Sequence, residues 1–237
     1  MTYFFKRIKR LFKASPDLYV KVYSHPRSGT HFLEGFIAKN FYGNSKLSID
    51  KVTWGHWSNR KINTDGNPYG KLFGNHYFAD RNTNTLPKIY IYRDGRAVAY
   101  SIWKTQNFVH KDIKNLSFKT FLRTKIDWYG SPSIQAEPTL TILEHWLAHV
   151  KSWIEASKLD SNILLIKYED LVNEPYIQYE KIHRFFFNKT VSLQKNEIDC
   201  IAKPIGLLPN KAKPDAWKEV FDEEDLKYYI ETVGNHF

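Results

Sequence analysis

The chain has 237 residues, of which 42% are apolar and 16% aromatic, and it carries a formal net charge of +10. This apolar content excludes an intrinsically disordered chain, and no apolar stretch approaches the length that spans a bilayer. Cys200 is the only cysteine, which excludes an internal disulfide and favours a reducing compartment such as the cytoplasm. The positive charge favours an anionic partner: nucleic acid, an anionic membrane surface, or a phosphorylated or sulfated ligand.

Residues 1–17 form a basic amphipathic segment. Its apolar side chains recur at helical spacing, with lysines and arginines between them: Phe4, Phe5, Ile8, Leu11 and Phe12. Such a helix can lie on an anionic membrane, or it can pack on the following domain with its basic face in water. No lipidation motif or signal-peptide core accompanies it, so we expect packing, with at most weak peripheral contact with a membrane.

The rest of the chain, residues 18–237, alternates strand-like and helix-like patterns. We expect strands at 18–24, 71–76 and 87–93, and a buried strand running into a turn at 162–171. We expect helices at 30–43, 94–106, 139–158, 173–187 and 221–234, and a long loop at 44–70. Gly43 should end the first helix, whereas Asn173 and Asp222 should cap the last two. This order predicts one α/β domain, with a central parallel β-sheet flanked by helices.

The heptapeptide SHPRSGT, which begins at Ser24, joins the first expected strand to the first helix. Backbone N–H groups and the helix dipole make such a junction an anion site. Gly29 lets the backbone approach a ligand, Ser28 and Thr30 add hydroxyl donors, and Arg27 adds a cation. The phosphate loop of nucleotide hydrolases instead reads G-x-x-x-x-G-K-[ST]. Here the first glycine and the lysine are both missing, which argues against hydrolysis of a nucleotide with magnesium.

A second anion motif lies in IYIYRDGRAVAYS, residues 89–101. Arg93 ends a strand, and Ser101 lies two helical turns into the next element, so a guanidinium and a hydroxyl can clamp one phosphate from two sides. The alternative is that Arg93 forms a structural ion pair with Asp94 or Glu169.

Together these motifs resemble those of the sulfotransferases that use 3′-phosphoadenosine 5′-phosphosulfate. HPRSGTHFL is similar to their 5′-phosphosulfate loop, and the segment from Arg93 to Ser101 is similar to their 3′-phosphate motif. LLIKYEDL, residues 164–171, resembles a third signature, in which Tyr168 would lie near the adenine. The three motifs occur in the family order, and the resemblance extends from about residue 18 to residue 221.

The resemblance implies a P-loop-like sulfotransferase fold and metal-independent transfer of a sulfuryl group. The donor would be 3′-phosphoadenosine 5′-phosphosulfate, the product 3′-phosphoadenosine 5′-phosphate (PAP), and the acceptor a hydroxyl or amine of a small molecule or carbohydrate. The implied nucleotide-binding residues are Arg27, Ser28, Gly29, Thr30, His31, Phe32, Arg93, Ser101, Tyr168 and Lys211. Lys211 lies in a basic loop, 210–218, that keeps a Trp-Lys pair but lacks the family's two glycines.

Arg27 would stabilise the charge that develops on the departing oxygen, since arginine stays protonated. A histidine suits the removal of the acceptor proton. His76 occupies a turn that loosely matches the family's catalytic turn, and His56 is its rival, with His31 a third alternative. Aromatic and polar side chains in the flanking loops are candidates for an acceptor pocket, although for any single aromatic residue among them a place in the core is the preferred interpretation: Trp54, His56, Trp57, Tyr77 and Phe78.

Two other classes of protein fit parts of this sequence. The positive charge and interleaved aromatic residues would permit a basic nucleic-acid-binding module. However, the charge is spread along the chain and no nucleic-acid motif is recognisable, so we expect no nucleic-acid partner. A kinase-like phosphotransferase with a phosphate loop would need magnesium and ATP, and the missing lysine disfavours it. We therefore expect a metal-free cytoplasmic sulfotransferase of undetermined oligomeric state.

Overall fold

The computed structural model describes residues 19–42, 72–82, 85–105, 109, 113, 115–128, 134, 139–190, 198 and 215–234. Several expectations lie outside these residues: the N-terminal segment 1–17, the loop 44–70 with Trp54, His56 and Trp57, the helix end at Gly43, and Lys211.

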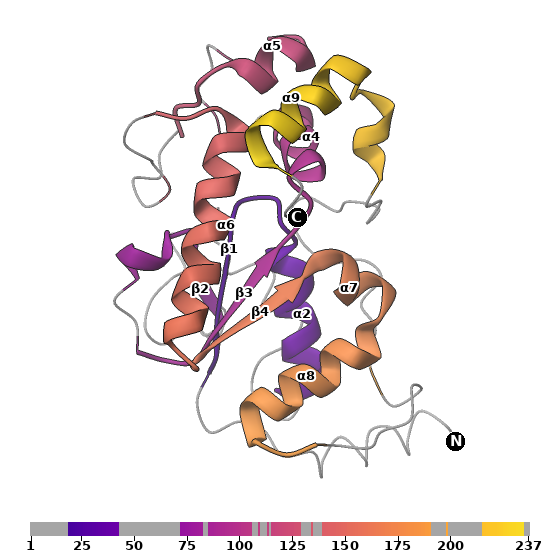
Figure 1. Ribbon diagram of the computed structural model, residues 1–237. Helices are drawn as coiled ribbons and strands as arrows, with labels where there is room; N and C mark the ends of the chain where they lie inside the picture. The colour runs from indigo at the N-terminus through magenta and orange to yellow at the C-terminus, as the bar shows by residue number, and fades with distance from the viewer. Residues whose placement is uncertain are drawn as a thin grey trace, which may run out of the picture.

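Within the described residues, four parallel strands form the sheet, in the order β2-β1-β3-β4 (Figure 1). The strands are β1 (Lys21–Ser24), β2 (Phe73–Asn75), β3 (Lys88–Tyr92) and β4 (Ile163–Lys167). They confirm the predicted parallel sheet. β4 lies at one end of this order, and only its Ile166 is fully buried, so the expectation of a wholly buried strand was wrong. Because all strands run the same way, the segments that follow them meet at one edge of the sheet.

Alternating side chains of β3 face two separate parts of the core. Ile89 and Ile91 pack in the cluster that contains α2 (Thr30–Phe41) and α8 (Pro175–Phe187). Tyr90 packs in the other cluster, with α4 (Gly95–Thr105) and α6 (Ile142–Leu159). This alternation follows from the two-residue repeat of a β-strand. Figure 1 shows the result, with α6 on one side of the sheet and α2 and α8 on the other.

Capping contacts explain where several helices begin. Thr141 and Glu144 form a capping box, so α6 starts at Ile142 and not at residue 139. Asp222 accepts from the N–H of Asp225 and caps α9 (Glu223–Val233), as predicted. Asn173 does not cap α8. It ends a short helix, α7 (Tyr168–Asn173), which replaces the expected turn, and α8 follows with Pro175 in its first turn.

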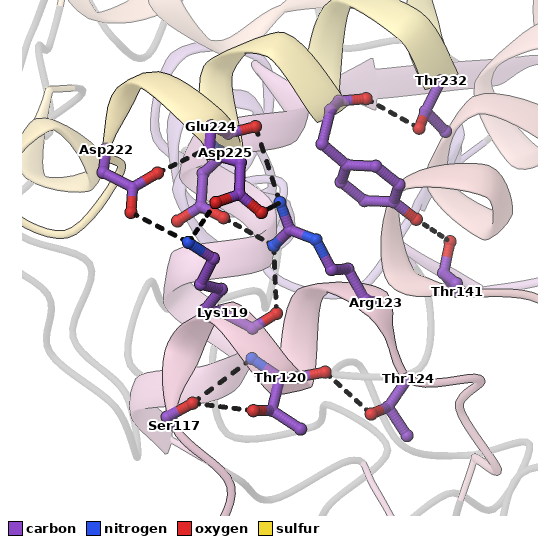
Figure 2. Close-up of polar contacts among 11 residues, drawn as sticks. Ser117, Lys119, Thr120, Arg123, Thr124, Thr141, Asp222, Glu224, Asp225 and Thr232 are labelled. Atoms are coloured by element: carbon purple, nitrogen blue, oxygen red, sulfur yellow. Dashed lines mark hydrogen bonds and ion pairs between the residues drawn. The ribbon is translucent and has the colours of Figure 1, made fainter.

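The sequence analysis missed one short helix, α5 (Phe118–Arg123), and two 3₁₀ turns, η3 (Ala79–Arg81) and η7 (Ala216–Glu219). Ion pairs join α5 to the start of α9 (Figure 2): Lys119 to Asp222 and Glu224, and Arg123 to Glu224 and Asp225. These helices gather with α4 beyond the strand ends, near the top of Figure 1. Within the described residues, no helix has the length and apolarity needed to cross a membrane.

Candidate functional site

The anion loop, residues 24–30, connects β1 to α2 with a strained backbone. Arg27 has φ of +67° and Gly29 has φ of +95°. A positive φ is costly for a residue with a side chain, and such strain concentrates at functional sites. The loop is closed by a bond from the Ser28 N–H to the carbonyl of His25 (3.2 Å) and by the paired hydroxyls of Ser24 and Thr30 (2.5 Å).

Tyr168 joins the anion loop to the other two predicted motifs. It begins α7 directly after β4 and is buried. Its ring lies so close to Gly29 that an added Cβ there would be only 2.8 Å from Tyr168 Cε2. The Arg93 guanidinium lies 4.6 Å from the centre of the same ring, and Phe32 meets it edge-on at 5.8 Å. Gly29 is therefore required both by its φ and by the approach of Tyr168.

The structure brings Arg27, Arg93 and Ser101 together. Arg27 Nε donates to Ser101 Oγ at 2.9 Å, although the two residues come from different motifs. Burial, and then the nearby positive charge of Arg93, lowers the pKa of Arg27 to about 10. Arg27 is still protonated at neutral pH, and no carboxylate in the described part of the chain pairs with it. Two cations held close together at a partly buried edge fit a ligand with several negative charges.

The backbone at Arg93 is fixed from α6. Trp146 Nε1 donates to the carbonyl of Arg93 at 3.1 Å. The same indole ring covers Gly95, where an added Cβ would lie 2.8 Å from the ring. Trp146 therefore holds the strand end while glycine makes room for it.

A second network engages Asp94, one of the two carboxylates considered as partners of Arg93. Burial raises the pKa of the other, Glu169, and the nearby positive charge of Arg93 opposes that rise. Asp94 forms an ion pair with Arg96 at 2.6 Å, and its N–H donates to Glu169 Oε1 at 3.1 Å. The contact with Asp94 raises the pKa of Arg96. The Arg96 guanidinium also stacks on Trp217 at 4.0 Å, which attaches the C-terminal segment beside the predicted 3′-phosphate site.

His76 lies just after β2, buried next to the anion loop. Its Nδ1–H donates to the carbonyl of Ser24 at 2.7 Å, so the lone pair of the neutral ring is on Nε2. Burial lowers the pKa of His76 to about 4, against an opposing contribution from the Ser24 carbonyl. His76 is thus neutral at physiological pH and in the protonation state that a base requires.

Three further histidines form a cluster that reaches the His76 backbone through His149, and the sequence analysis missed all of them. His25, His145 and His149 are buried, and burial lowers the pKa of each. The sequence feature that could have identified them is the pair His145 and His149, which lie four residues apart within the apolar stripe of α6. Among the described residues, no group of three or more His, Cys, Asp or Glu side chains is arranged to hold a metal ion.

The remaining site candidates occupy different places. His31 is partly exposed on α2, with its Nδ1 3.9 Å from Glu34. Tyr77 follows His76, and its carbonyl accepts from the indole of Trp153. Phe78 packs against the rings of His145 and His149, as a core residue does.

Comparisons with known proteins place this arrangement in a family. The sulfotransferase domain pattern matches residues 75–230. The amine sulfotransferase of Oryctolagus cuniculus is 25% identical over 208 residues, or 83% of this chain and 64% of that protein. The chain thus spans just under two thirds of this relative.

Two kinds of solved structure share the fold. A mouse sulfotransferase complexed with PAP has a TM-score of 0.55 and 17% identity, over 94% of this chain and 86% of that chain. A retinol dehydratase complexed with androsterone and the inactive cofactor PAP has a TM-score of 0.60 and 17% identity, over 90% and 79% of the two chains. Since the family pattern covers more than half of the chain, this protein belongs to the sulfotransferase domain family.

Proposed function

We propose that this protein transfers a sulfuryl group from 3′-phosphoadenosine 5′-phosphosulfate to a hydroxyl or amine of a small-molecule or carbohydrate acceptor. The observation that carries the proposal is the meeting of Arg27, Arg93 and Ser101 beside the strained anion loop. The PAP in the structural neighbours supports this nucleotide, and the name of the rabbit relative supports an amine as one acceptor class.

Each part of the site has a separate task in binding the donor. The N–H groups and hydroxyls of Ser28, Gly29 and Thr30 would hold the 5′-phosphosulfate at the start of α2. Arg93 and Ser101 would hold the 3′-phosphate. Tyr168 and Phe32 would contact the adenine, while His31 and Lys211 would add polar contacts at the edge of the site. Arg27, in the anion loop, completes the set of proposed nucleotide-binding residues.

Arg27 and His76 would carry the chemistry. When bound, the donor supplies a sulfuryl group whose bond to a phosphate oxygen breaks as the acceptor atom bonds to sulfur. Arg27 would stabilise the electron pair left on that phosphate oxygen, by charge and without giving up its own proton. His76 Nε2 would take the acceptor's proton, for which its neutral state prepares it.

The test compares the wild type with Arg93→Ala by calorimetry, using PAP and adenosine 5′-phosphate in the presence of EDTA. The wild type should bind PAP without a metal, and ligand at a hundred times its Kd should stabilise the fold by about 2.7 kcal/mol. Arg93→Ala should weaken PAP binding about 10- to 100-fold but leave adenosine 5′-phosphate binding nearly unchanged, because only PAP has the 3′-phosphate. Arg123→Ala, on α5, is the matched control. Binding that requires magnesium, or tighter binding of a random single-stranded oligonucleotide, would contradict the proposal.

A further inference from the structure

α6 holds the segment that carries His76. Three hydrogen bonds join the helix to residues 76–79: His149 Nε2 to the His76 carbonyl (3.2 Å), Trp153 Nε1 to the Tyr77 carbonyl (2.9 Å), and the Ala79 N–H to Ser152 Oγ (3.2 Å). The three helical residues lie within about one turn, so they act on the segment together. The position of His76 is therefore set by α6 as well as by its own strand.

Each hydrogen bond made by His149 has only one possible donor. The His76 carbonyl can only accept, so Nε2 of His149 carries the hydrogen. Burial keeps His149 neutral, so its Nδ1 has the lone pair and accepts from the Tyr90 hydroxyl at 2.8 Å. That hydroxyl is buried, and the nearby backbone N–H of His25 opposes the rise that burial causes in the pKa of Tyr90. The hydrogen bonds therefore run from Tyr90 through His149 to the carbonyl of His76.

His76 is joined to the anion loop through its own ring. Its Nδ1–H donates to the carbonyl of Ser24, the neighbour of His25. Tyr90 and His149 are fully buried, and Tyr90 stacks on Trp153 with ring centres 5.0 Å apart and planes 9° apart. The hydroxyl of Tyr90 is thus held in place, and the bonds to the carbonyl and to Nδ1 of His76 fix both its location and its tautomer.

We propose that Tyr90 and His149 are positioning residues that hold His76 at a fixed distance and orientation from the anion loop. This inference rests on the proposed role of His76 as the base. A base acts only within hydrogen-bond reach of the proton it removes, and a misplacement of about 1 Å can cost about 100-fold in rate. Tyr90 and His149 are not assigned to the donor site, so their loss should affect transfer and not PAP binding.

Three variants separate the contacts. Tyr90→Phe removes the hydroxyl and keeps the stacked ring. His149→Gln can place an amide nitrogen near the position of Nε2 and keep the bond to the His76 carbonyl. His149→Asn can place its oxygen near the position of Nδ1 and keep the bond from Tyr90, but it loses the donor to His76. The bond to His76 is the one that matters directly, so the Asn variant should be slower than the Gln variant.

The measurement is kcat across phenol acceptors of falling pKa, together with the Kd of PAP. On the least acidic phenol, Tyr90→Phe and His149→Asn should lose about 10- to 100-fold in kcat, and the loss should shrink on acidic phenols that need little base. The Kd of PAP should change less than threefold. Equal losses across the series, or equal rates for the Gln and Asn variants, would overturn the proposal, because a general structural defect does not depend on the acceptor.

Two further measurements distinguish a failure of the positioning inference from a failure of the base assignment. In the wild type at pH 7, long-range ¹H–¹⁵N spectra should show His149 with its hydrogen on Nε2 and His76 with its hydrogen on Nδ1; the opposite tautomer at either ring would overturn the proposal. If His76→Ala shows the acceptor-dependent loss but the Tyr90 and His149 variants do not, only the positioning inference fails. If His76→Ala keeps the wild-type rate on every phenol, the base assignment fails, and the inference fails with it.

Discussion

The anion loop and the contact between α5 and α9 both contain arginines, but they treat positive charge differently. Arg123 on α5 donates to Asp225 at 2.6 Å, and the Asp225 carboxylate is almost fully buried (Figure 2). At the anion loop, Arg27 faces another cation, Arg93, and its pKa is lowered to about 10. At the α5–α9 contact, opposite charges pair within the chain and stabilise the fold. At the anion loop, two positive charges lie near each other, which lowers the stability of the fold.

This difference separates residues that we expect to stabilise the fold from residues that we propose to bind a ligand. Cations that are desolvated beside one another are unfavourable until an anion binds between them. The left-handed backbone of Arg27 adds to that cost. Ion pairs that close the α5–α9 contact have no such cost, and they also hold the helix that follows Trp217 against the rest of the domain. Substitutions in the anion loop should therefore change activity, whereas substitutions in the α5–α9 contact should change the free energy of unfolding.

Arg27→Ala should have the largest effect, and on activity alone. Loss of a group that stabilises charge in the transition state commonly costs about 10²–10³ in kcat. Stability should not fall, because the substitution removes the repulsion by Arg93, while alanine keeps a Cβ and leaves the backbone strain at this position unchanged. Sulfate transfer and urea unfolding should be measured together, with Arg27→Lys as a control that keeps the charge. A loss of more than about 1 kcal/mol in unfolding free energy, well outside the usual range for a neutral substitution, would mean that Arg27 supports the fold.

Arg123→Ala should show the opposite behaviour. It leaves the buried Asp225 carboxylate without its cation, and because Arg123 is partly exposed we expect a loss of about 2 kcal/mol, below the range for a fully buried pair. The kcat of the folded enzyme should remain near that of the wild type. Urea unfolding gives the free energy of unfolding. The transfer rate, divided by the concentration of sites titrated with PAP, gives kcat. A fall in kcat comparable to that of Arg27→Ala would erase the distinction between the two regions.

Acid should destabilise the histidine-rich side of the anion loop before it affects the α5–α9 contact. The pKa of His76 is about 4 in the folded protein and about 6.5 when unfolded, so the unfolded chain binds more protons between these values. The contribution of His76 to the free energy of unfolding is thus present above pH 6.5 and is lost as the pH falls towards 4. The loss amounts to about 2 kcal/mol between pH 7 and pH 5. The pKa of Asp222 at α9 is lowered, so that carboxylate protonates only in stronger acid.

Unfolding measurements at pH 7 and pH 5, for the wild type and His76→Gln, check the prediction about acid. The variant should lose less stability over this range, because glutamine does not titrate. An identical loss in both proteins would show that His76 does not account for the acid sensitivity.

Lys119→Ala should have the smallest effect of all. Lys119 pairs with Asp222 and Glu224 (Figure 2), but all three side chains are exposed. Solvent and salt screen such pairs, and many contribute nothing measurable. We expect an unfolding free energy indistinguishable from that of the wild type at physiological salt. A resolvable loss, comparable to that of Arg123→Ala, would mean that the whole network acts as one unit.

The sequence predicted the sheet, its strands and most helices because their signals are local. β1, β3 and α6 have the periodicity expected of a strand or a helix, and Asp222 caps α9 as its position indicates. The boundaries that were wrong have local competitors. Thr141 forms a capping box that overrides the apolar pattern before it, and the short α7 displaces the expected cap at Asn173.

The sequence by itself also determined the anion loop. Arg27, Ser28, Gly29 and Thr30 are adjacent, so they can be recognised as an anion site without knowledge of the residues that the fold brings near them. Only the tertiary structure decided which distant residues meet there. Ser101 lies 74 residues from Arg27, and His149 lies 59 residues from Tyr90, yet each pair is joined by one hydrogen bond. Periodicity states which face of an element is buried, but it does not state what that face meets. The order of the strands brings the carboxyl ends of β1, β2 and β3 to one edge, and the packing of α6 on that sheet places Tyr90 and His149 beside His76.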